Sequence, residues 1–256
     1  MPPLFSRNTR WRAAAIHVAI GAALAALCFA VVRFAWYPDA LFEAASAAKL
    51  MGLVAAVLLV AGPLATLVVY VPGKWGLKFD LVAIALLQAT AVGYAMWTFF
   101  ESRPVYVVFV KDRFELVRAD DFPESEVARA GSSPFLRMPL LRPALAGARM
   151  PRDRAEAERI MFLAPSGLDL HHMPQHYVVY DAVRTEALAR AQPLSALRKL
   201  NPAAGAEIDA LVRAAGGVEE ALVFLPMRAG TRDLTVVLDR RNGDVVRLAA
   251  LRPWEY

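Results

Sequence analysis

The chain has little cysteine and lacks the common catalytic motifs. Cys28 is its single cysteine among 256 residues, so no internal disulfide holds any part of it together. A glycine-rich phosphate loop, a G-x-S-x-G elbow, an H-E-x-x-H pair and paired cysteines are all missing from the sequence. These absences remove the usual signatures of nucleotide, hydrolase and zinc sites, and they favour a protein that works without catalysis and without a cofactor.

Charge is also missing from three long apolar runs. Residues 13–32, 50–71 and 81–100 contain no Asp, Glu, Lys or Arg, although charged residues make up 21% of the chain and hydrophobic ones 57%. A bilayer core of about 30 Å needs roughly 20 apolar residues of helix to cross it. A charge at the centre of such a helix costs about 2.5 to 3.5 kcal/mol, so charge-free runs of this length favour insertion. The sequence therefore predicts a bundle of three transmembrane helices.

The first apolar run has a second interpretation, a cleaved signal peptide, because it follows a basic start. Its apolar stretch is long for a signal peptide, and two more such runs follow it. Leu27 stands before Cys28, at the place where a lipoprotein signal has a small residue. An uncleaved anchor is therefore the favoured interpretation.

The basic residues beside these runs predict an orientation, because Lys and Arg next to a span tend to remain in the cytoplasm. Arg7, Arg10 and Arg12 precede the first run, and Lys74 and Lys78 lie between the second and the third. Three spans then leave the N-terminus in the cytoplasm and everything after residue 101 across the membrane. In a Gram-negative bacterium this describes a multi-pass inner-membrane protein with a periplasmic C-terminal domain.

Residues 102–256 predict a periplasmic α+β domain that follows the transmembrane domain of residues 1–101. Two apolar stretches flank Lys111, Asp112 and Arg113, and they predict a β-hairpin. The pair Asn242-Gly243 lies between two alternating runs and predicts another hairpin with a type I′ turn. We expect these hairpins, at opposite ends of the domain, to share one sheet.

The middle of this domain predicts helices. Loops with short helices are expected over residues 120–165, which are rich in Pro, Ala and Arg. One helix, interrupted at Pro193, is expected over residues 188–200. A further helix is expected over residues 202–217, where a Gly pair is suited to a C-cap.

Three histidines, His171, His172 and His176, are the best candidates for a metal cluster. Pro174 interrupts any helix that would align them, and the adjacent His171 and His172 are expected to point apart. Histidines at the surface or partly buried, with no metal, are therefore the favoured interpretation.

The acidic residues of the domain have an ordinary structural explanation. Asp120 and Asp121 adjoin a predicted strand end, and Asp239 and Asp244 flank the Asn-Gly turn. Asp is favoured in turns and caps, so structural roles are expected. The net charge of +5 is scattered among acids with no basic stripe, which argues against nucleic acid as a partner.

The apolar runs contain few polar residues, and Gln88 lies near the middle of the third. An amide without a partner is costly in a membrane, so Gln88 is expected to face another helix and not lipid. A packing hydrogen bond is the simpler interpretation, and contact with a partner's transmembrane helix is the alternative.

Gly21 and Ala25 predict a close approach of the first helix to its neighbour. Gly62-Pro63 predicts a bend in the second helix.

Four stretches together carry a family resemblance. They are WYPDALF after the first apolar run, GPLATLVVYVPGK at the end of the second, residues 79–121, and the closing residues 221–256. In this order they resemble the type IV pilin accessory proteins of the TfpX/TfpZ type. The positions that match the family pattern are Trp36, Tyr37, Pro38, Gly62, Pro63, Leu64, Thr66, Pro72, Gly73, Lys74, Asp80, Leu81, Gln88, Tyr94, Arg103, Pro104, Asp112, Arg113 and Phe114. Members often have an acidic residue shortly before the Gly-Pro pair, where this chain has Leu58, and a Gly after the Tyr, where it has Ala95. These departures argue against an intramembrane charge as the working part.

The resemblance implies an inner-membrane accessory protein for type IV pilus biogenesis. Its partners would be pilin, held in the bilayer by an apolar helix, and possible pilus assembly proteins, and it would catalyse no reaction. Two other classes stay open. A pilin-modifying transferase would need a charged residue in the outer loop, where Asp39 and Glu43 are the available ones. A membrane-anchored periplasmic sensor or scaffold would bind a ligand without depending on pilin.

Overall fold

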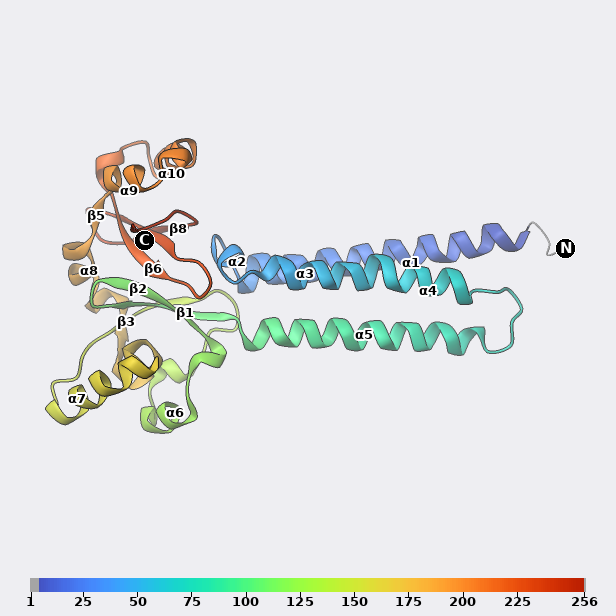
Figure 1. Cartoon of the computed structure of the whole chain (residues 1–256), viewed down its shortest axis with the longest axis horizontal. Coiled ribbons are helices and arrows are strands. Elements are labelled where there is room, and N and C mark those ends of the chain that lie inside the picture. Colours follow the sequence, from blue (N-terminus) through green and yellow to red (C-terminus); the bar gives the residue numbers. More distant parts are fainter. Residues whose placement is uncertain (1–4, 256) are drawn as a thin grey trace. The chain divides into compact units, whose positions relative to one another are not determined.

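The computed structural model describes residues 5–255, and the chain divides into two compact units (Figure 1). The first, here called the helical unit, contains the chain through Phe34 and then Ser46–Phe100. The second, here called the sheet unit, contains Ala35–Ala45 and everything from Glu101 onward. The loop after the first apolar run therefore belongs to the same unit as the C-terminal part of the chain.

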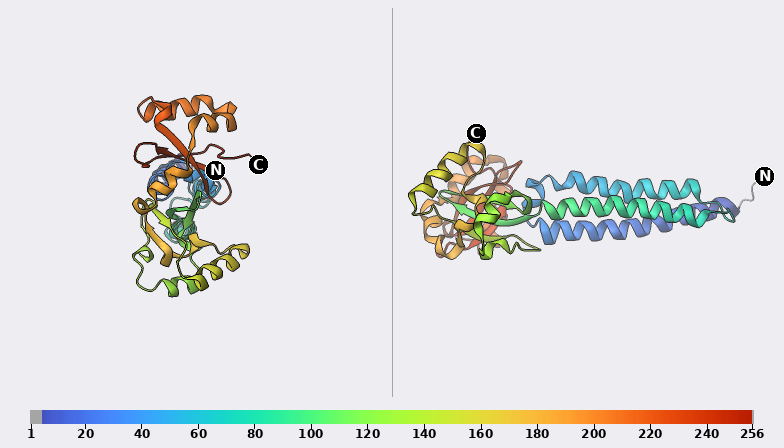
Figure 2. Two further views of the ribbon diagram at one scale, coloured as in Figure 1. Left: turned by 90° about the vertical axis from the view of Figure 1, so that its left-hand side faces the viewer. Right: turned by 90° about the horizontal axis from the view of Figure 1, so that it is seen from below.

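Three helical segments within residues 5–255 are long and apolar enough to cross a membrane: Thr9–Trp36, Ala47–Val69 and Leu77–Glu101. They run side by side (Figure 2). Their elements are α1 (Phe5–Ala30) with a π-helix (Val31–Trp36), α3 (Ala47–Ala56) with a π-helix (Val57–Ala61) and α4 (Gly62–Val69), and α5 (Leu77–Glu101). The three helices predicted from the charge-free runs are thus confirmed as helices of spanning length.

Small residues let these helices approach closely. A Cβ atom placed on Gly21 would lie 2.4 Å from the carbonyl oxygen of Leu58, so glycine is required for this contact between α1 and the π-helix. This confirms the close approach predicted at Gly21. A π-helix precedes Gly62-Pro63 in the second helix, and in it the N–H of Gly62 donates to the carbonyl of Val57. Pro63 has no N–H to continue the ladder, and the bend expected at this pair stays a prediction.

The sheet unit is built on one mixed sheet of eight strands within the described residues. Its order is β4-β3-β1-β2-β6-β7-β8, with β5 paired to β6 beside β2. The strands are β1 (Pro104–Val110), β2 (Arg113–Arg118), β3 (Ala144–Ala148), β4 (Tyr177–Val179), β5 (Gln192–Pro193), β6 (Leu222–Arg228), β7 (Leu234–Asp239) and β8 (Val245–Ala249). Both predicted hairpins form, as β1–β2 and β7–β8, and they share this sheet as expected.

Helices lie at the two ends of the sheet, α6 and α7 at one end and α9 and α10 at the other (Figure 1). One core packs β1, β3 and β4 with Ile160 of α7, and another packs β6–β8 with Leu197 of α9 and Ile208 of α10. The bounds of the helices are α2 (Leu41–Ala44), α6 (Glu124–Ala130), α7 (Arg154–Leu163), α8 (Arg184–Arg190), α9 (Leu194–Leu200) and α10 (Gly205–Ala214). The interruption expected at Pro193 is present, since α8 and α9 flank β5.

Three details of the prediction are wrong. Residues 144–148, expected as loop, form β3, which pairs in parallel with β1. The Asn-Gly hairpin has no type I′ turn, because only Gly243 of the pair has a positive φ and the N–H of Asp239 donates to the carbonyl of Asp244 across a longer loop. The rings of His171 and His172 do not point apart but lie against each other, with centroids 3.9 Å apart and planes tilted by 43°.

Candidate functional site

The first candidate site is a polar cluster inside the helical unit that joins all three long helices. The Nδ1 atom of His17 in α1 lies 2.6 Å from the hydroxyl oxygen of Thr66 in α4. Its Nε2 atom lies 2.7 Å from the amide oxygen of Gln88 in α5. A ring that donates from Nε2 to the amide oxygen and accepts at Nδ1 from the hydroxyl satisfies both contacts. Gln88 therefore faces other helices, as predicted.

The π-helix explains why this cluster fits. The amide nitrogen of Gln88 donates to the carbonyl oxygen of Val57 at 3.0 Å, the same carbonyl that closes the π turn. A Cβ atom on Gly62 would lie 2.0 Å from that amide nitrogen, so only glycine leaves room for the side chain of Gln88. Pro63 and Thr66 are buried beside it. Four of the predicted site residues, Gly62, Pro63, Thr66 and Gln88, are thus brought together.

Other predicted positions of the helical unit lie outside this cluster. Lys74 and Asp80 form an ion pair of 2.5 Å across the loop between α4 and α5, and Gly73 in the same loop has a φ of +77°. The side chain of Tyr94 is 74% exposed. The loop pair and Tyr94 are therefore separate from the polar cluster.

The predicted residues on either side of the α5–β1 junction are fixed within the sheet unit. The hydroxyl of Tyr37 lies 3.1 Å from that of Ser102, and Arg103, which is only 5% exposed, donates from Nε to the carbonyl of Pro139 at 3.3 Å. Trp36 is the last residue of the π-helix, and the carbonyl of Pro38 accepts a hydrogen bond from the N–H of Leu41. Pro104 is buried and is the first residue of β1. Two residues, Ser102 and Arg103, separate α5 from β1, and both are anchored.

The second candidate site is a polar groove of about 560 Å³ on the sheet unit. Segments distant in sequence form it: the turn between β1 and β2, the end of α8 with β5, the end of β6, and the C-terminal stretch. Its lining residues are Asp112, Arg113, Arg190, Gln192, Pro226, Arg228, Asp233, Trp254 and Glu255. We call it the arginine groove. Two predicted site residues, Asp112 and Arg113, belong to it.

The lining of the arginine groove holds three arginines and three carboxylates, those of Asp112, Asp233 and Glu255, and only some of these charges pair with one another. Arg113 donates to the buried Glu115 at 2.6 Å and also pairs with Asp112 at 3.4 Å. Burial raises the pKa of Glu115, while the hydrogen bond from Arg113 opposes that rise. The exposed side chains of Arg190 and Arg228 make no hydrogen bond or ion pair with any residue that the structure describes. Two guanidinium groups are thus available for a ligand or partner.

An aromatic side chain stands beside these cations. The indole N–H of Trp254 donates to a carboxylate oxygen of Asp233 at 3.1 Å, which fixes the ring at the edge of the groove. Guanidinium forks match carboxylates in geometry, and an indole adds apolar contact area. The unpaired guanidinium groups of Arg190 and Arg228 are therefore the part of the groove that is suited to bind a carboxylate.

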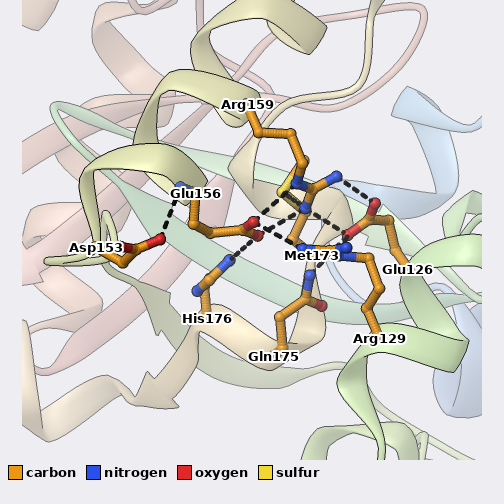
Figure 3. Close-up of polar contacts among 8 residues, drawn as sticks. All are labelled: Glu126, Arg129, Asp153, Glu156, Arg159, Met173, Gln175 and His176. Carbon is orange, nitrogen blue, oxygen red and sulfur yellow. Dashed lines mark hydrogen bonds and ion pairs between the residues drawn. The ribbon is translucent and has the colours of Figure 1, made fainter.

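A third polar cluster, shown in Figure 3, joins α6 to α7 and to the turn before β4. Arg159 donates to Glu126 at 2.8 and 3.1 Å and to Glu156 at 2.8 and 2.9 Å. Gln175 donates to Glu126 at 2.6 Å, and His176 lies 3.2 Å from Glu156. The hydrogen bond from Arg159 lowers the pKa of Glu156 to about 2. The charged groups of this cluster pair with one another, so its role is structural.

Several of the remaining acidic candidates have structural partners. Asp121 accepts from the N–H of Arg118, and Asp239 accepts from the N–H of Arg241, both at 2.8 Å. Glu43 pairs with Arg232 at 3.5 Å, within the sheet unit. In the part of the chain that the structure describes, no group of three His, Cys, Asp or Glu side chains is placed to hold a metal ion.

Sequence reasoning missed residues of both sites. His17 was absent from the expected set although its polarity inside a charge-free run was a visible signal. Arg190, Arg228 and Trp254 carried no local signal, because each becomes part of the groove only through strand pairing that joins distant segments.

The structure defines a class of protein: one with a candidate membrane bundle of three long apolar helices, a polar cluster among those helices, and a folded α+β unit.

Similar proteins come from Dichelobacter nodosus. A fimbrial assembly protein of serogroup I is 29% identical over 231 residues, covering 88% of this chain and 89% of the relative. The fimbrial assembly protein of serogroup E1 is 27% identical over the same shares of both chains.

A third relative, the fimbrial assembly protein of serogroups C1 and C2, is 30% identical over 118 residues, which cover 89% of that protein and 45% of this chain. The chain therefore belongs to the family of fimbrial assembly proteins. No protein-family model matches it, and no solved structure matches it.

Proposed function

We propose that this protein is an inner-membrane accessory protein of the TfpX/TfpZ type, which binds pilin and assists type IV pilus biogenesis. The observation that carries the proposal is the match to fimbrial assembly proteins over 88% of the chain. The bundle of three candidate spans supports it, because a pilin subunit waiting in a membrane would present an apolar helix to such a bundle. The basic residues near the first and third helices support a cytoplasmic N-terminus and a periplasmic sheet unit.

On the sheet unit we assign the contact with pilin to the arginine groove. The side chains of Arg190 and Arg228 have no hydrogen-bonded or ion-paired partner within residues 5–255, so a carboxylate on the pilin head would replace water around them and not another protein group. Charge complementarity of this kind sets partner choice and association rate, and it weakens with salt. The action proposed is binding, with no covalent step.

Capture of pilin by the tagged full-length protein tests this assignment. Double charge reversal of the groove, Arg190→Glu with Arg228→Glu, is expected to lower capture at least about tenfold. The matched control reverses two exposed arginines outside the groove, Arg213→Glu with Arg247→Glu, and is expected to capture pilin as the wild type does. Equal capture by both double variants would remove the groove from the proposal, and no capture by the wild type would remove pilin as the partner.

The connection between the units offers a second test. Since only Ser102 and Arg103 separate α5 from β1, insertion of about eight Gly and Ser residues after Ser102 adds a flexible tether. If capture needs both units in a fixed relation, the insertion lowers capture and piliation. Unchanged capture and piliation would show that the units act independently.

The transferase alternative is tested at the loop residues. The variant Asp39→Asn with Glu43→Gln removes both loop carboxylates while keeping the side-chain size. We expect normal piliation and unmodified pilin mass, because Glu43 already pairs with Arg232 and serves the fold. Loss of a modification from pilin, seen by mass spectrometry, would favour the transferase.

A further inference from the structure

A cavity of about 710 Å³ lies in the helical unit, at the end of the bundle where α1 and α5 begin and α4 ends. Its size is within the roughly 300 to 1,000 Å³ of ordinary ligand pockets. The residues that line it are Thr9, Arg12, Ala13, Ile16, His17, Ile20, Thr66, Tyr70, Leu81 and Ala85. We call it the bundle slot.

The spacing of these residues makes the slot a continuous groove along the helices. On α1 they recur every three or four positions from Thr9 to Ile20, which is one face of a helix. Thr66 and Tyr70 are four apart, and so are Leu81 and Ala85, so each neighbouring helix adds two successive turns. The slot therefore follows the helix axes and does not cross them.

The length of the slot matches one leaflet of a bilayer. From Thr9 to Ile20 the helix rises about 16 Å at roughly 1.5 Å per residue. A hydrocarbon core of about 30 Å gives about 15 Å for each leaflet. A partner's transmembrane helix would need a groove along the whole core, whereas a single acyl chain needs only half of it.

Charge differs between the two ends of the slot. Arg12 lies near its outer end, is exposed, and makes no hydrogen bond or ion pair with another residue in the described part of the chain. Apolar side chains such as Ile16, Ile20 and Leu81 line the rest of the slot, and the contact between His17 and Thr66 lies on its wall, about one helical turn before Ile20 at the inner end. Apolar walls below one unpaired cation at headgroup depth describe the complement of an anionic phospholipid.

We propose that the bundle slot binds one acyl chain of an anionic phospholipid, with Arg12 holding the phosphate of its headgroup. The inference rests on the proposed insertion of the helical unit in a membrane, and it is independent of pilin. Because His17 and Thr66 line the slot, an acyl chain that fills the space between α1, α4 and α5 would pack against both side chains and hold them in place.

The probe is phosphatidylglycerol, compared with phosphatidylcholine, in the full-length protein purified in a mild detergent. The wild type is expected to retain about one phosphatidylglycerol per chain through native mass spectrometry, and to gain thermal stability when that lipid is added back. Arg12→Gln is expected to lose the preference for phosphatidylglycerol while still binding some lipid of either kind. Lys78→Gln removes a cation at the same end of the bundle that does not line the slot, and it should behave as the wild type.

A second pair of variants tests the acyl part. Ala13→Phe, and independently Ala85→Phe, fill the slot from different helices and are expected to abolish retention of both lipids. A variant that keeps the melting temperature of the lipid-free wild type counts as folded, and either variant suffices. Equal retention of the two lipids by the wild type, equal losses in Arg12→Gln and Lys78→Gln, or unchanged retention in a folded Phe variant would overturn the proposal. Failure here with pilin capture intact would leave the pilus role standing.

Discussion

The helical unit and the sheet unit differ in how polar side chains contribute to each. In the helical unit the cluster of His17, Thr66 and Gln88 lies among apolar and small side chains and links three helices. In the sheet unit, Arg159 alone bonds two carboxylates inside a network that reaches two helices and a turn. Between transmembrane helices such bonds average about 0.6 kcal/mol and reach about 1.7 kcal/mol. Breaking a buried ion pair costs about 3 to 5 kcal/mol.

The difference follows from what surrounds each cluster. If the helical unit lies in lipid, its polar groups find partners in the unfolded helices as well, so their bonds select which faces meet more than they add stability. In the sheet unit, Glu126 is only 2% exposed, so loss of its partner leaves a buried carboxylate with weaker compensation. We expect packing to dominate the stability of the helical unit and a few buried charges to dominate local stability in the sheet unit.

Removal of Arg159 should give the largest effect. Arg159→Ala leaves Glu126 and Glu156 facing each other without their shared cation, and we expect a loss of about 3 kcal/mol in the free energy of unfolding. This is the lower end of the range for buried pairs, because Arg159 is partly exposed, with 26% of its side chain accessible. Chemical denaturation of the full chain in detergent, followed by tryptophan fluorescence, measures it.

The control for this variant is Arg154→Ala. Arg154 pairs with Glu158 on the same helix, but its side chain is 92% exposed, so we expect a change within about 0.5 kcal/mol. If both variants cost the same, the network in Figure 3 is no stronger than a surface pair and the contrast between the units is wrong.

Packing in the helical unit is tested at Gly62. Gly62→Ala places a methyl group against the amide of Gln88 and should cost about 2 kcal/mol, as overpacking usually does. Gly93→Ala on α5 meets nothing within 4 Å and should be neutral or stabilising, because alanine favours a helix over glycine by about 1 kcal/mol. Unfolding in mixed micelles of rising SDS content measures both.

The cause of the Gly62 effect can be isolated with Gln88. In the double variant Gly62→Ala with Gln88→Ala the clash is gone. The loss of stability in the double variant should therefore be smaller than the sum of the losses in the two single variants. A double-mutant cycle in which they are additive would mean that Gly62 serves a different contact, and the fit between the π-helix and the polar cluster would lose its explanation.

Much of the fold was predictable from the sequence because its signals were local. Charge-free runs identified the long helices, and alternating stretches around Lys111 to Arg113 and around Asn242-Gly243 identified the hairpins. Residues 144–148 were missed as a strand because the sequence ALAGA has no β-branched or aromatic residue, although β3 lies between β4 and β1 and pairs with both. Pairing with a strong strand overrides the weak local preference of such a segment.

The sites were less predictable, for a different reason in each unit. Gln88 alone predicted an interhelical contact, yet its partners depend on which helix faces meet, and the sequence does not specify that. Asp112 and Arg113 were expected from a family pattern, whereas Arg190 and Arg228 reach the same groove through the pairing of β5 and β2 with β6. Arg190 and Arg228 are far in sequence from each other and from Asp112 and Arg113, so no sequence motif contains all four residues.

Titration of the adjacent His171 and His172 should give a smaller effect on stability than Gly62→Ala. Burial lowers the pKa of both His171 and His172. The unfolded chain therefore binds protons near the ordinary pKa of about 6.5, while the folded chain does not. Their contribution to stability is complete above that pH and declines as the pH falls toward their folded pKa.

Melting temperatures of the full chain at pH 7.5 and 5.5 measure this decline. His171→Gln with His172→Gln should flatten the difference between the two pH values. Glu156 does not contribute to a difference between pH 7.5 and 5.5. Its pKa in the folded chain is about 2, so the stability that it provides is lost only when the pH falls below the ordinary pKa of a glutamate. An equally steep decline in the double variant would assign the pH dependence to other groups.

The smallest effect is expected at the loop pair Lys74–Asp80. The two side chains are 43% and 28% exposed, and exposed ion pairs contribute about 0 to 1 kcal/mol, so Lys74→Gln should change unfolding by less than about 0.5 kcal/mol. Both residues match the family pattern, so a stability change this small alongside lost piliation would assign them to a partner and not to the fold. The same SDS titration used for Gly62 measures the stability, with Lys78→Gln as the control for charge. A loss as large as that of Gly62→Ala would reverse the ranking, because a solvent-exposed pair would then hold the helical unit more strongly than the packing around its polar cluster.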